Sequence, residues 1–322
     1  MNPTPAVRKL LLVASTGGHL AELVRLHPSL GAADDSLWVT FRTPQSETLL
    51  AGRRTLYVRY VRPRDLFGVV VVFFTVLWFL RRERFDAAVS TGSGIALACF
   101  PAAMLRRIPT SYIESLGRVR GPSVTGTLLA RTRMTTMYRQ SGSWGQPVWH
   151  PHTSALSTFR AVPRAVSTQR PRLFVTLGTI EGYRFDRLVD AVLASGLADE
   201  RTVWQLGETT RTDLPGTAYT QLSSCDYLAA VRQSDVVISH AGVGSMLVLL
   251  EEGVFPILAT RRSERNEHVD DHQLQMIEMV EEAGVGVVVD APDVTADLIR
   301  SAQSRAVVDD AADASVVDAV AS

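Results

Sequence analysis

Two turns in this chain combine glycines with a histidine at the expected start of a helix. The first reads ASTGGH at residues 14–19, and the second reads SHAGVGS at residues 239–245. Glycines let the backbone approach a ligand closely, and the first amides of a helix offer unpaired donors to an anion. Both turns are therefore typical of phosphate or diphosphate sites. His19 could act as a general base on a hydroxyl beside the diphosphate, or could only help to cap its helix, and His240 could donate to a phosphate oxygen.

A carboxylate follows a further expected strand, in the segment YIESLGR at residues 112–118. Glu114 stands at the C-terminal end of that strand, where α/β folds build their active sites. It could act as a base or orient a sugar hydroxyl, and a surface ion pair with Arg118 is the structural alternative. Arg118 could also meet a phosphate. The turn STGSG at residues 90–94, which contains Ser93, follows another expected strand and is a candidate of the same kind.

The polar segment EHVDDHQ at residues 267–273 opens an expected helix. Its histidines and carboxylates could be read as a metal cluster, but His268 and His272 lack the glutamate of the His-Glu-x-x-His zinc pattern. Hydrogen bonding to a sugar and a ribose is the better interpretation, so we expect no metal. Gly178 and Thr179 follow another expected strand and are candidates for backbone contact with phosphate.

Alternating strands and helices must position these turns. In the N-terminal half, strand-length apolar runs alternate with helical spacings. Strands are expected over 9–14, 37–41, 55–60, 87–90 and 110–113, and helices over 19–30 and 96–105. The second half repeats the pattern. Its strands are expected over 173–177, 203–206, 236–239 and 256–259, and its helices over 185–194, 243–252 and 273–282. This alternation predicts an α/β fold with parallel sheets, whose ligands lie at the carboxyl ends of the strands.

The composition is that of a globular chain with two domains. The 322 residues are 46% hydrophobic and 20% charged, which excludes a disordered chain. Two cysteines exclude a disulfide scaffold and a cysteine-based zinc site, and favour a reducing compartment. Turn formers over 142–170 indicate the linker. We therefore expect domains over 1–165 and 166–306, with the tail 307–322 as a crossing helix or a disordered segment.

Charge is divided unevenly between the halves. Residues 1–165 hold 21 Lys and Arg against 8 Asp and Glu, whereas the remaining residues hold 12 against 25. A basic half suits an anionic surface such as phospholipid head groups or a lipid diphosphate, although attraction between two complementary domains is the alternative. The basic excess lacks interleaved aromatics and a reading helix, so we expect no nucleic-acid partner.

One apolar run of 15 residues, from Leu66 to Leu80, has arginines on both sides. About 20 residues are needed to span a bilayer as a helix, so the run is too short for a span. Monotopic insertion, with arginines at the lipid phosphates, fits better than the alternative of a helix buried against the sheet. The sequence predicts membrane contact through this run.

Seven strings together resemble inverting GT-B glycosyltransferases that use UDP-sugars and lipid-diphosphate acceptors. The likeness is to the two-subunit N-acetylglucosaminyltransferase of dolichol-linked oligosaccharide synthesis and to bacterial exopolysaccharide and capsule enzymes, here with acceptor and donor subunits fused. The acceptor-like strings are ASTGGHLAEL (14–23), FDAAVSTGSG (85–94) and YIESLGRVRGPSVTGTLLA (112–130). The donor-like strings are FVTLGT (174–179), YRFDRLVDAV (183–192), SDVVISHAGVGS (234–245) and EHVDDHQ (267–273). The resemblance implies two Rossmann-like domains facing a cleft.

The resemblance also implies roles for single residues. His19 and Glu114 are the candidate bases, and the acceptor-binding residues would be Gly17, Gly18, Ser93 and Arg118. The donor-binding residues would be Gly178, Thr179, His240, Gly242, Gly244, Ser245, Asp271, His272 and Gln273. One position departs from the related pattern, because Val248 stands where a glutamate three residues after Ser245 usually meets the ribose.

These features predict a glycosyltransferase that moves a sugar from a UDP-sugar to a polyprenyl-diphosphate-linked saccharide, with no cofactor. We expect it on the cytoplasmic face of the cell membrane, as a peripheral or monotopic protein. A UDP-sugar epimerase is one alternative, since the same architecture supports that chemistry. A non-catalytic partner that binds UDP-sugar or lipid is the other, and Val248 is its main support.

Overall fold

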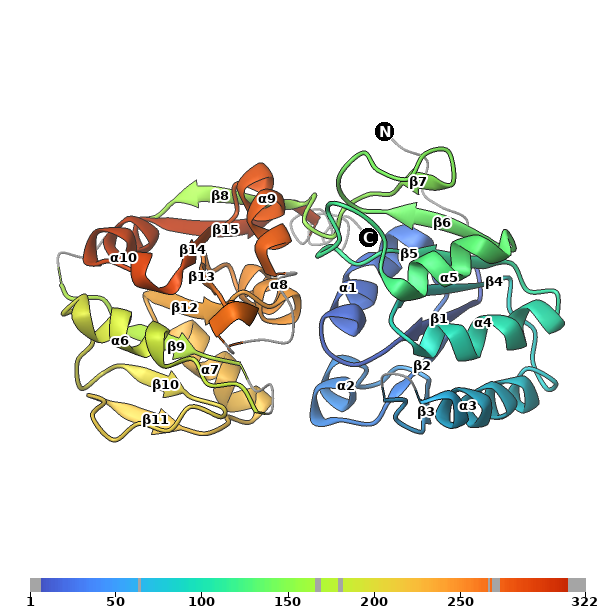
Figure 1. The fold of residues 1–322 in the computed structure, drawn as a ribbon, viewed down its shortest axis with the longest axis horizontal. Helices are drawn as coiled ribbons and strands as arrows, with labels where there is room; N and C mark the ends of the chain where they lie inside the picture. The colour runs from blue at the N-terminus through green and yellow to red at the C-terminus, as the bar shows by residue number, and fades with distance from the viewer. Residues whose placement is uncertain are drawn as a thin grey trace, which may run out of the picture. The chain divides into compact units, whose positions relative to one another are not determined.

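The chain divides into two compact units, Met1–Ala155 (unit 1) and Leu156–Ser322 (unit 2). The computed structural model describes residues 7–62, 65–165, 169–178, 182–265, 267 and 273–311, with only the backbone of 263 and 273–276 (Figure 1). Each unit is built on its own sheet, and each is described by itself.

Unit 1 has a seven-stranded parallel sheet in the order β3-β2-β1-β4-β5-β6-β7. Its centre is apolar and buried, as expected for a parallel sheet covered on both faces. The strands are β1 (Leu10–Ala14), β2 (Leu37–Phe41), β3 (Thr55–Val58), β4 (Ala87–Gly92), β5 (Thr110–Ile113), β6 (Thr135–Arg139) and β7 (Trp149–Pro151). The order of the first six is that of the Rossmann fold, whose direction reverses between β1 and β4.

Helices connect these strands. They are α1 (Gly18–Leu26), a short 3-10 turn at His27–Leu30, α2 (Pro44–Leu49), α3 (Leu66–Phe79), α4 (Ile95–Leu105) and α5 (Val124–Thr132). Serine and threonine begin two of them, since the Thr43 side chain caps α2 and the Ser123 side chain caps α5. The expected strands and helices of this half are therefore confirmed, with boundaries that shift by a few residues.

Unit 2 repeats the arrangement with a six-stranded parallel sheet in the order β11-β10-β9-β12-β13-β14. Its strands are β9 (Leu173–Thr176), β10 (Val203–Gln205), β11 (Thr217–Tyr219), β12 (Val236–His240), β13 (Ile257–Thr260) and β14 (Val287–Asp290). Its helices are α6 (Asp186–Ala194), α7 (Ser224–Gln233), α8 (Val243–Glu251), α9 (Gln273–Ala283) and α10 (Ala296–Gln303), with 3-10 turns at Ser263–Arg265 and Ala291–Asp293. The order again reverses at one place, between β9 and β12, so both units are Rossmann-like.

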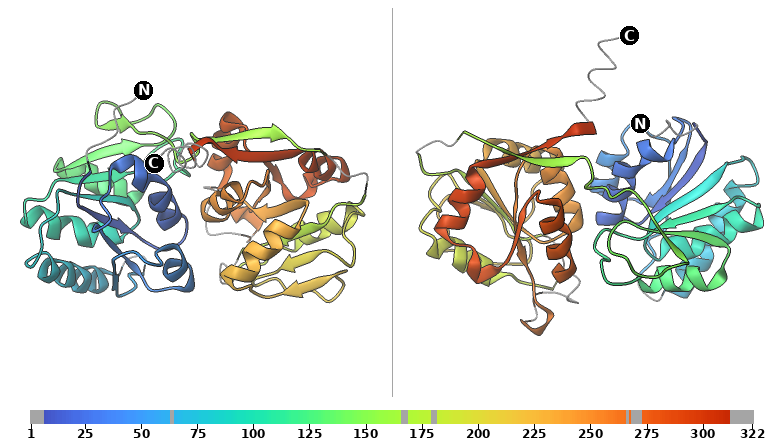
Figure 2. Two further views of the ribbon diagram at one scale, coloured as in Figure 1. Left: turned by 180° about the vertical axis from the view of Figure 1, so that it is seen from behind. Right: turned by 90° about the horizontal axis from the view of Figure 1, so that it is seen from above.

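A separate antiparallel pair joins two segments that are far apart in the sequence. β8 (Phe159–Pro163) pairs with β15 (Arg305–Asp309), and the two strands run side by side along unit 2 (Figure 2). This pairing places β8 in unit 2, so the division falls at Ala155 and Leu156 rather than at 165 and 166. It also places residues 307–309 in a strand, not in a crossing helix, while 312–322 lie outside the described residues.

The apolar run from Leu66 to Leu80 forms a single helix, α3, which has one buried face and one exposed face. Gly68, Val72 and Val76 are buried, and α3 packs against α4. Leu66, Phe67, Val70, Phe74 and Trp78 are exposed. The run is therefore partly a core helix and partly an outward apolar surface. In the part of the chain that the structure describes, no helix is long and apolar enough to cross a bilayer.

Candidate functional site

The predicted turn at residues 14–19 lies where the sheet of unit 1 reverses direction. β1 ends at Ala14, and the neighbouring strand β4 ends at Gly92. The Ser15 amide donates to the Gly92 carbonyl at 2.9 Å, and the Ser93 amide donates to the Ser15 hydroxyl at 3.2 Å. Ligands of Rossmann-like sheets bind at this place, beyond the carboxyl ends of the strands. The structure thus brings the loops of Gly17 and Ser93 together.

Glycine is required at the start of α1. Gly17 has φ +89° and precedes the helix, and no side chain caps it. Its amide donates to the side-chain oxygen of Gln45 at 2.7 Å, which fixes the turn. Gly18 is the first residue of the helix. The first-turn amides of α1 have no partner within the helix and can face an anion.

His19 is oriented by the neighbouring strand. Its Nδ1 lies 2.8 Å from the Thr91 carbonyl oxygen, and the Thr91 hydroxyl donates to the His19 carbonyl at 2.7 Å. A carbonyl only accepts, so Nδ1 carries the proton and the neutral ring keeps its lone pair on Nε2. Burial lowers the pKa of His19, and the charge of Arg118 lowers it further, which favours this neutral form. The ring is prepared to accept a proton at Nε2.

Glu114 is buried at the end of β5. Its Oε2 accepts from the Ser123 amide at 2.8 Å and the Ser123 hydroxyl at 3.0 Å, and its Oε1 accepts from the Ser115 amide at 3.2 Å. Burial raises its pKa, and these donors and the charge of Arg118 oppose the rise. Because Ser123 also caps α5, Glu114 ties the loop 115–123 to the start of that helix.

Glu22 belongs to the same region and was missed by sequence reasoning. It is fully buried, and its carboxylate accepts from the Ser115 hydroxyl at 2.6 Å, the Leu116 amide at 3.1 Å and the Gln140 side chain at 2.9 Å. Burial raises its pKa to about 7. The signal in the sequence was its place three residues after His19, which puts both on one face of α1.

The second predicted turn lies at the reversal point of unit 2. His240 ends β12, next to β9, and its ring fills the space between two glycines. A Cβ at Gly178 would lie 2.7 Å from His240 Cε1, and one at Gly242 would lie 2.6 Å from Nε2. Gly178 also has φ +77°. Gly178 therefore requires glycine because of its positive φ, and at Gly242 a larger residue would displace the ring of His240.

Helix α8 starts beside that ring. The amides of Val243, Gly244 and Ser245 lie in the first turn and therefore have no partner within the helix. Gly242, which precedes the helix, has no side chain that could accept from them. Such a start binds anions well, since the helix dipole adds to the donors. Val248, one turn later, is half-buried and brings no carboxylate.

A buried arginine that the sequence analysis did not single out lies next to this site. Arg261 follows β13 and donates to three main-chain carbonyls, those of Leu177, Tyr183 (3.3 Å) and Glu267 (3.0 Å). Its guanidinium also lies over the Phe185 ring, 5.0 Å from the centroid. Burial lowers the pKa of Arg261 to about 10, so the group stays charged at neutral pH.

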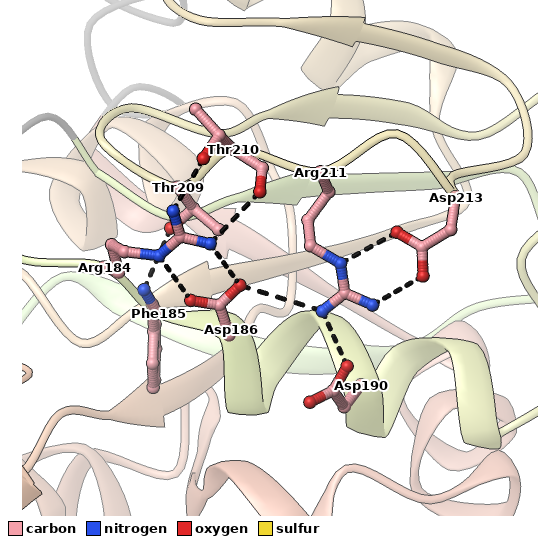
Figure 3. A network of polar contacts seen from close by, with 8 residues as sticks. All are labelled: Arg184, Phe185, Asp186, Asp190, Thr209, Thr210, Arg211 and Asp213. Carbon is pink, nitrogen blue, oxygen red and sulfur yellow. Dashed lines mark hydrogen bonds and ion pairs between the residues drawn. The ribbon is translucent and has the colours of Figure 1, made fainter.

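The segment that carries Tyr183 and Phe185 is also held by a network of polar side chains (Figure 3). Arg184 donates to the Thr210 hydroxyl at 2.6 Å and to Asp186 at 2.8 Å, and the Phe185 amide donates to the Thr209 hydroxyl at 2.9 Å. Arg211, in the loop after β10, forms ion pairs with Asp190 of α6 and with Asp213 of its own loop, both at 2.6 Å. The loop after β9 is thus fixed where the structure describes it.

Some predicted donor residues cannot be placed. Thr179, Asp271 and His272 lie outside the described residues, and of Gln273 only the backbone, at the start of α9, is described. Within the described residues no group of three or more His, Cys, Asp and Glu side chains is placed to hold a metal ion. The roles of EHVDDHQ and the absence of a metal stay predictions.

Comparison with known proteins agrees with this geometry. Residues 173–311 match the model of the glycosyltransferase family 28 C-terminal domain. A curated relative from Synechococcus elongatus, UDP-N-acetylglucosamine--N-acetylmuramyl-(pentapeptide) pyrophosphoryl-undecaprenol N-acetylglucosamine transferase, is 26% identical over 315 residues. The match covers 91% of this chain and 85% of that protein.

Solved structures share the fold of both units. MurG of Acinetobacter baumannii has a TM-score of 0.54 at 16% identity, with 91% of this chain and 89% of that chain covered. UDP-GlcNAc 2-epimerase of Methanocaldococcus jannaschii has a TM-score of 0.56 at 11% identity, with 91% of each covered. The expected GT-B fold is confirmed. The chain therefore has a GT-B fold, and residues 173–311 of its second unit match the glycosyltransferase family 28 C-terminal domain.

Proposed function

We propose that this protein transfers an N-acetylhexosaminyl group from a UDP-sugar to a polyprenyl-diphosphate-linked saccharide, with inversion. The Synechococcus relative, whose name states a UDP-N-acetylglucosamine donor and a pyrophosphoryl-undecaprenol acceptor, supports this donor and acceptor class. A role in exopolysaccharide or capsule synthesis stays a prediction from the sequence.

The donor diphosphate would bind at the start of α8. The observation that carries this proposal is the pairing of His240, set between two glycines, with the uncapped amides of Gly244 and Ser245. These donors would stabilise the charge that develops on UDP as it leaves, so the proposal requires no metal. Thr179, Asp271, His272 and Gln273 are proposed to complete the site.

The acceptor hydroxyl would be activated by His19. In one displacement, its oxygen forms a bond to the anomeric carbon, the bond from that carbon to UDP breaks, and the proton goes to His19 Nε2. The fixed Nδ1 proton supports this role, because it leaves Nε2 as the basic atom. Glu114 already accepts several hydrogen bonds, so it would position the loop with Arg118, while Gly17, Gly18 and Ser93 would face the acceptor diphosphate.

The lipid acceptor lies in a membrane, and we propose that the outer face of α3 contacts that membrane. Cations border the exposed aromatic rings of this face. Arg82 lies 3.9 Å from the Trp78 ring centroid, and Arg59 lies 5.4 Å from that of Phe67. Exposed apolar side chains between arginines suit the boundary of an anionic bilayer. In unit 2, by contrast, Tyr219 is the only large apolar side chain exposed among the described residues.

A transfer assay tests the proposal. Radiolabelled UDP-N-acetylglucosamine is incubated with vesicles that contain a polyprenyl-diphosphate-linked saccharide, in EDTA, and the label in the lipid fraction is measured. We expect labelled lipid from the wild-type protein, formed about 10²- to 10⁴-fold more slowly by His19→Ala. No labelled lipid with any UDP-sugar tested would contradict the proposal.

Epimerisation is the second candidate function, because the Methanocaldococcus epimerase shares the fold to the same degree. The same assay without acceptor separates the two. An epimerase converts the UDP-sugar into its C2 epimer in the absence of lipid, whereas a transferase leaves it unchanged. A chain that binds UDP but does neither is the non-catalytic partner that Val248 suggests.

A further inference from the structure

One of the three hydrogen bonds of Arg261 goes to the peptide group that precedes Gly178. Its guanidinium donates to the Leu177 carbonyl oxygen, and the Leu177 amide donates to the Gln205 carbonyl at 2.9 Å. Leu177 is therefore held through both of its main-chain polar groups. A peptide unit is planar and trans, so the Leu177 carbonyl and the Gly178 N–H point in opposite directions. By holding the carbonyl, Arg261 sets the direction of the Gly178 amide.

The same guanidinium joins loops from two strands. Leu177 and Tyr183 belong to the loop after β9, and Glu267 belongs to the loop after β13. The Glu267 side chain then accepts from the Arg262 amide at 3.0 Å, which closes the second loop on itself. Both loops begin at the carboxyl ends of the two strands that flank β12, the strand that leads into α8. One buried side chain thus sets the spacing of the two loops that border the proposed donor site.

A buried arginine that donates only to main-chain carbonyls contributes more to the positions of those carbonyls than to the stability of the fold. Removing a guanidinium from water is costly, and an apolar side chain of similar volume often fills such a place as well. The planar fork of arginine, however, can hold several carbonyls at fixed angles, which neither methionine nor lysine can do. Arg261 donates to three carbonyls, and its guanidinium carbon lies 5.0 Å from the centroid of the Phe185 ring.

We propose that Arg261 is a positioning residue for the donor diphosphate, which fixes the Leu177–Gly178 peptide and the main chain of Glu267 in the arrangement that UDP requires. This inference rests on the proposed function, because it takes the UDP site to lie at the start of α8. It does not require Arg261 to touch the ligand.

The test compares Arg261→Met and Arg261→Lys with a matched control, Arg139→Met. Arg139 is also a buried arginine that donates to main-chain carbonyls, those of Gly142 and Trp149, but it lies in unit 1. UDP affinity is measured by calorimetry, unfolding by urea titration, and the KM values for donor and acceptor by the transfer assay.

We expect Arg261→Met to weaken UDP binding by about ten- to a hundredfold, as small displacements of positioning groups do. We expect Arg261→Lys to fall between it and wild type. The donor KM should rise with the UDP dissociation constant while the acceptor KM stays unchanged, which a general loss of stability would not produce. Arg139→Met should lower the urea midpoint and leave the UDP dissociation constant as in wild type.

The outcomes separate this inference from the proposed function. Equal UDP affinity in wild type and Arg261→Met would overturn the inference alone. A wild-type protein that does not bind UDP would overturn the proposed function instead. If Arg261→Met is unfolded, Arg261→Lys decides: folded protein with weakened UDP binding supports the inference, and folded protein with wild-type affinity overturns it.

Discussion

Removing the aromatic side chains from the outer face of α3 should release the protein from membranes. Phe67, Phe74 and Trp78 are 68%, 61% and 53% exposed, so serine at these positions leaves the buried face of the helix in place. That buried face, with Val72 and Val76, keeps α3 packed on α4. The triple variant therefore changes the surface without opening the core.

The size of the effect follows from the exposed area. An aromatic side chain has roughly 150–250 Å² to bury, so each of the three offers about 120 Å² to a bilayer. At about 25 cal/mol per Å² this amounts to about 3 kcal/mol for each side chain, and about 9 kcal/mol for all three. An interfacial helix sinks only partly into the hydrocarbon. If one third of the total is realised, about 3 kcal/mol is lost, which lowers the partition coefficient roughly 150-fold.

Sedimentation with vesicles of phosphatidylglycerol and phosphatidylcholine measures this partition. The matched control is Tyr219→Ser, which removes an exposed aromatic ring (43% exposed) from β11 in unit 2. We expect the control to sediment like wild type and the triple variant to stay in solution. If the triple variant is folded by circular dichroism and sediments like wild type, the assignment of α3 to the membrane is refuted.

Three further predictions concern the proposed site and the buried carboxylate beside it. His240→Ala should weaken UDP binding about tenfold in calorimetry, because it removes the donor held between the two glycines; an unchanged dissociation constant would remove His240 from the site. His19→Ala should lower the rate of transfer by about 10²- to 10⁴-fold, and Glu114→Gln should lower it as well, while neither changes UDP affinity, since neither residue is a proposed ligand of UDP. Full activity in both variants would place the base elsewhere. Glu22 has a pKa of about 7 when folded against 4.5 as the ordinary value, so the folded state binds more protons in this window and stability falls as pH rises through it. Urea titrations should show a loss of about 3 kcal/mol between pH 4.5 and 7 in wild type that Glu22→Gln lacks; parallel curves would show that the carboxyl titrates normally.

Much of the fold could be predicted because local patterns determine it. Each apolar run expected above to be a strand became a strand of one of the two sheets, and the glycine turns at 14–19 and 239–245 lie where the strand order reverses. The β8–β15 pair could not be predicted. Its partners are separated by more than 140 residues, and a short strand next to prolines reads as a linker until its partner is known.

Site residues that belong to a single glycine turn could be predicted from the sequence. Site residues whose partners come from several distant segments were missed. His19 and His240 lie in glycine turns at helix starts, a pattern that predicts an anion site. Arg261 stands in a polar loop beside another arginine, and only the folded chain shows that its donors reach the loop after β9. Glu22 reads as an ordinary polar helix residue, although the partners that bury it come from residues 115–140.

The proposed function depends most on a nucleotide site at the start of α8, and a titration of the purified protein with UDP tests that site directly. Calorimetry is done in EDTA, with ADP and GDP as controls. We predict saturable binding of UDP, with no binding of ADP or GDP, despite Val248 in place of a carboxylate. Absence of binding, or equal binding of all three nucleotides, would contradict the assignment of this helix start to the UDP diphosphate.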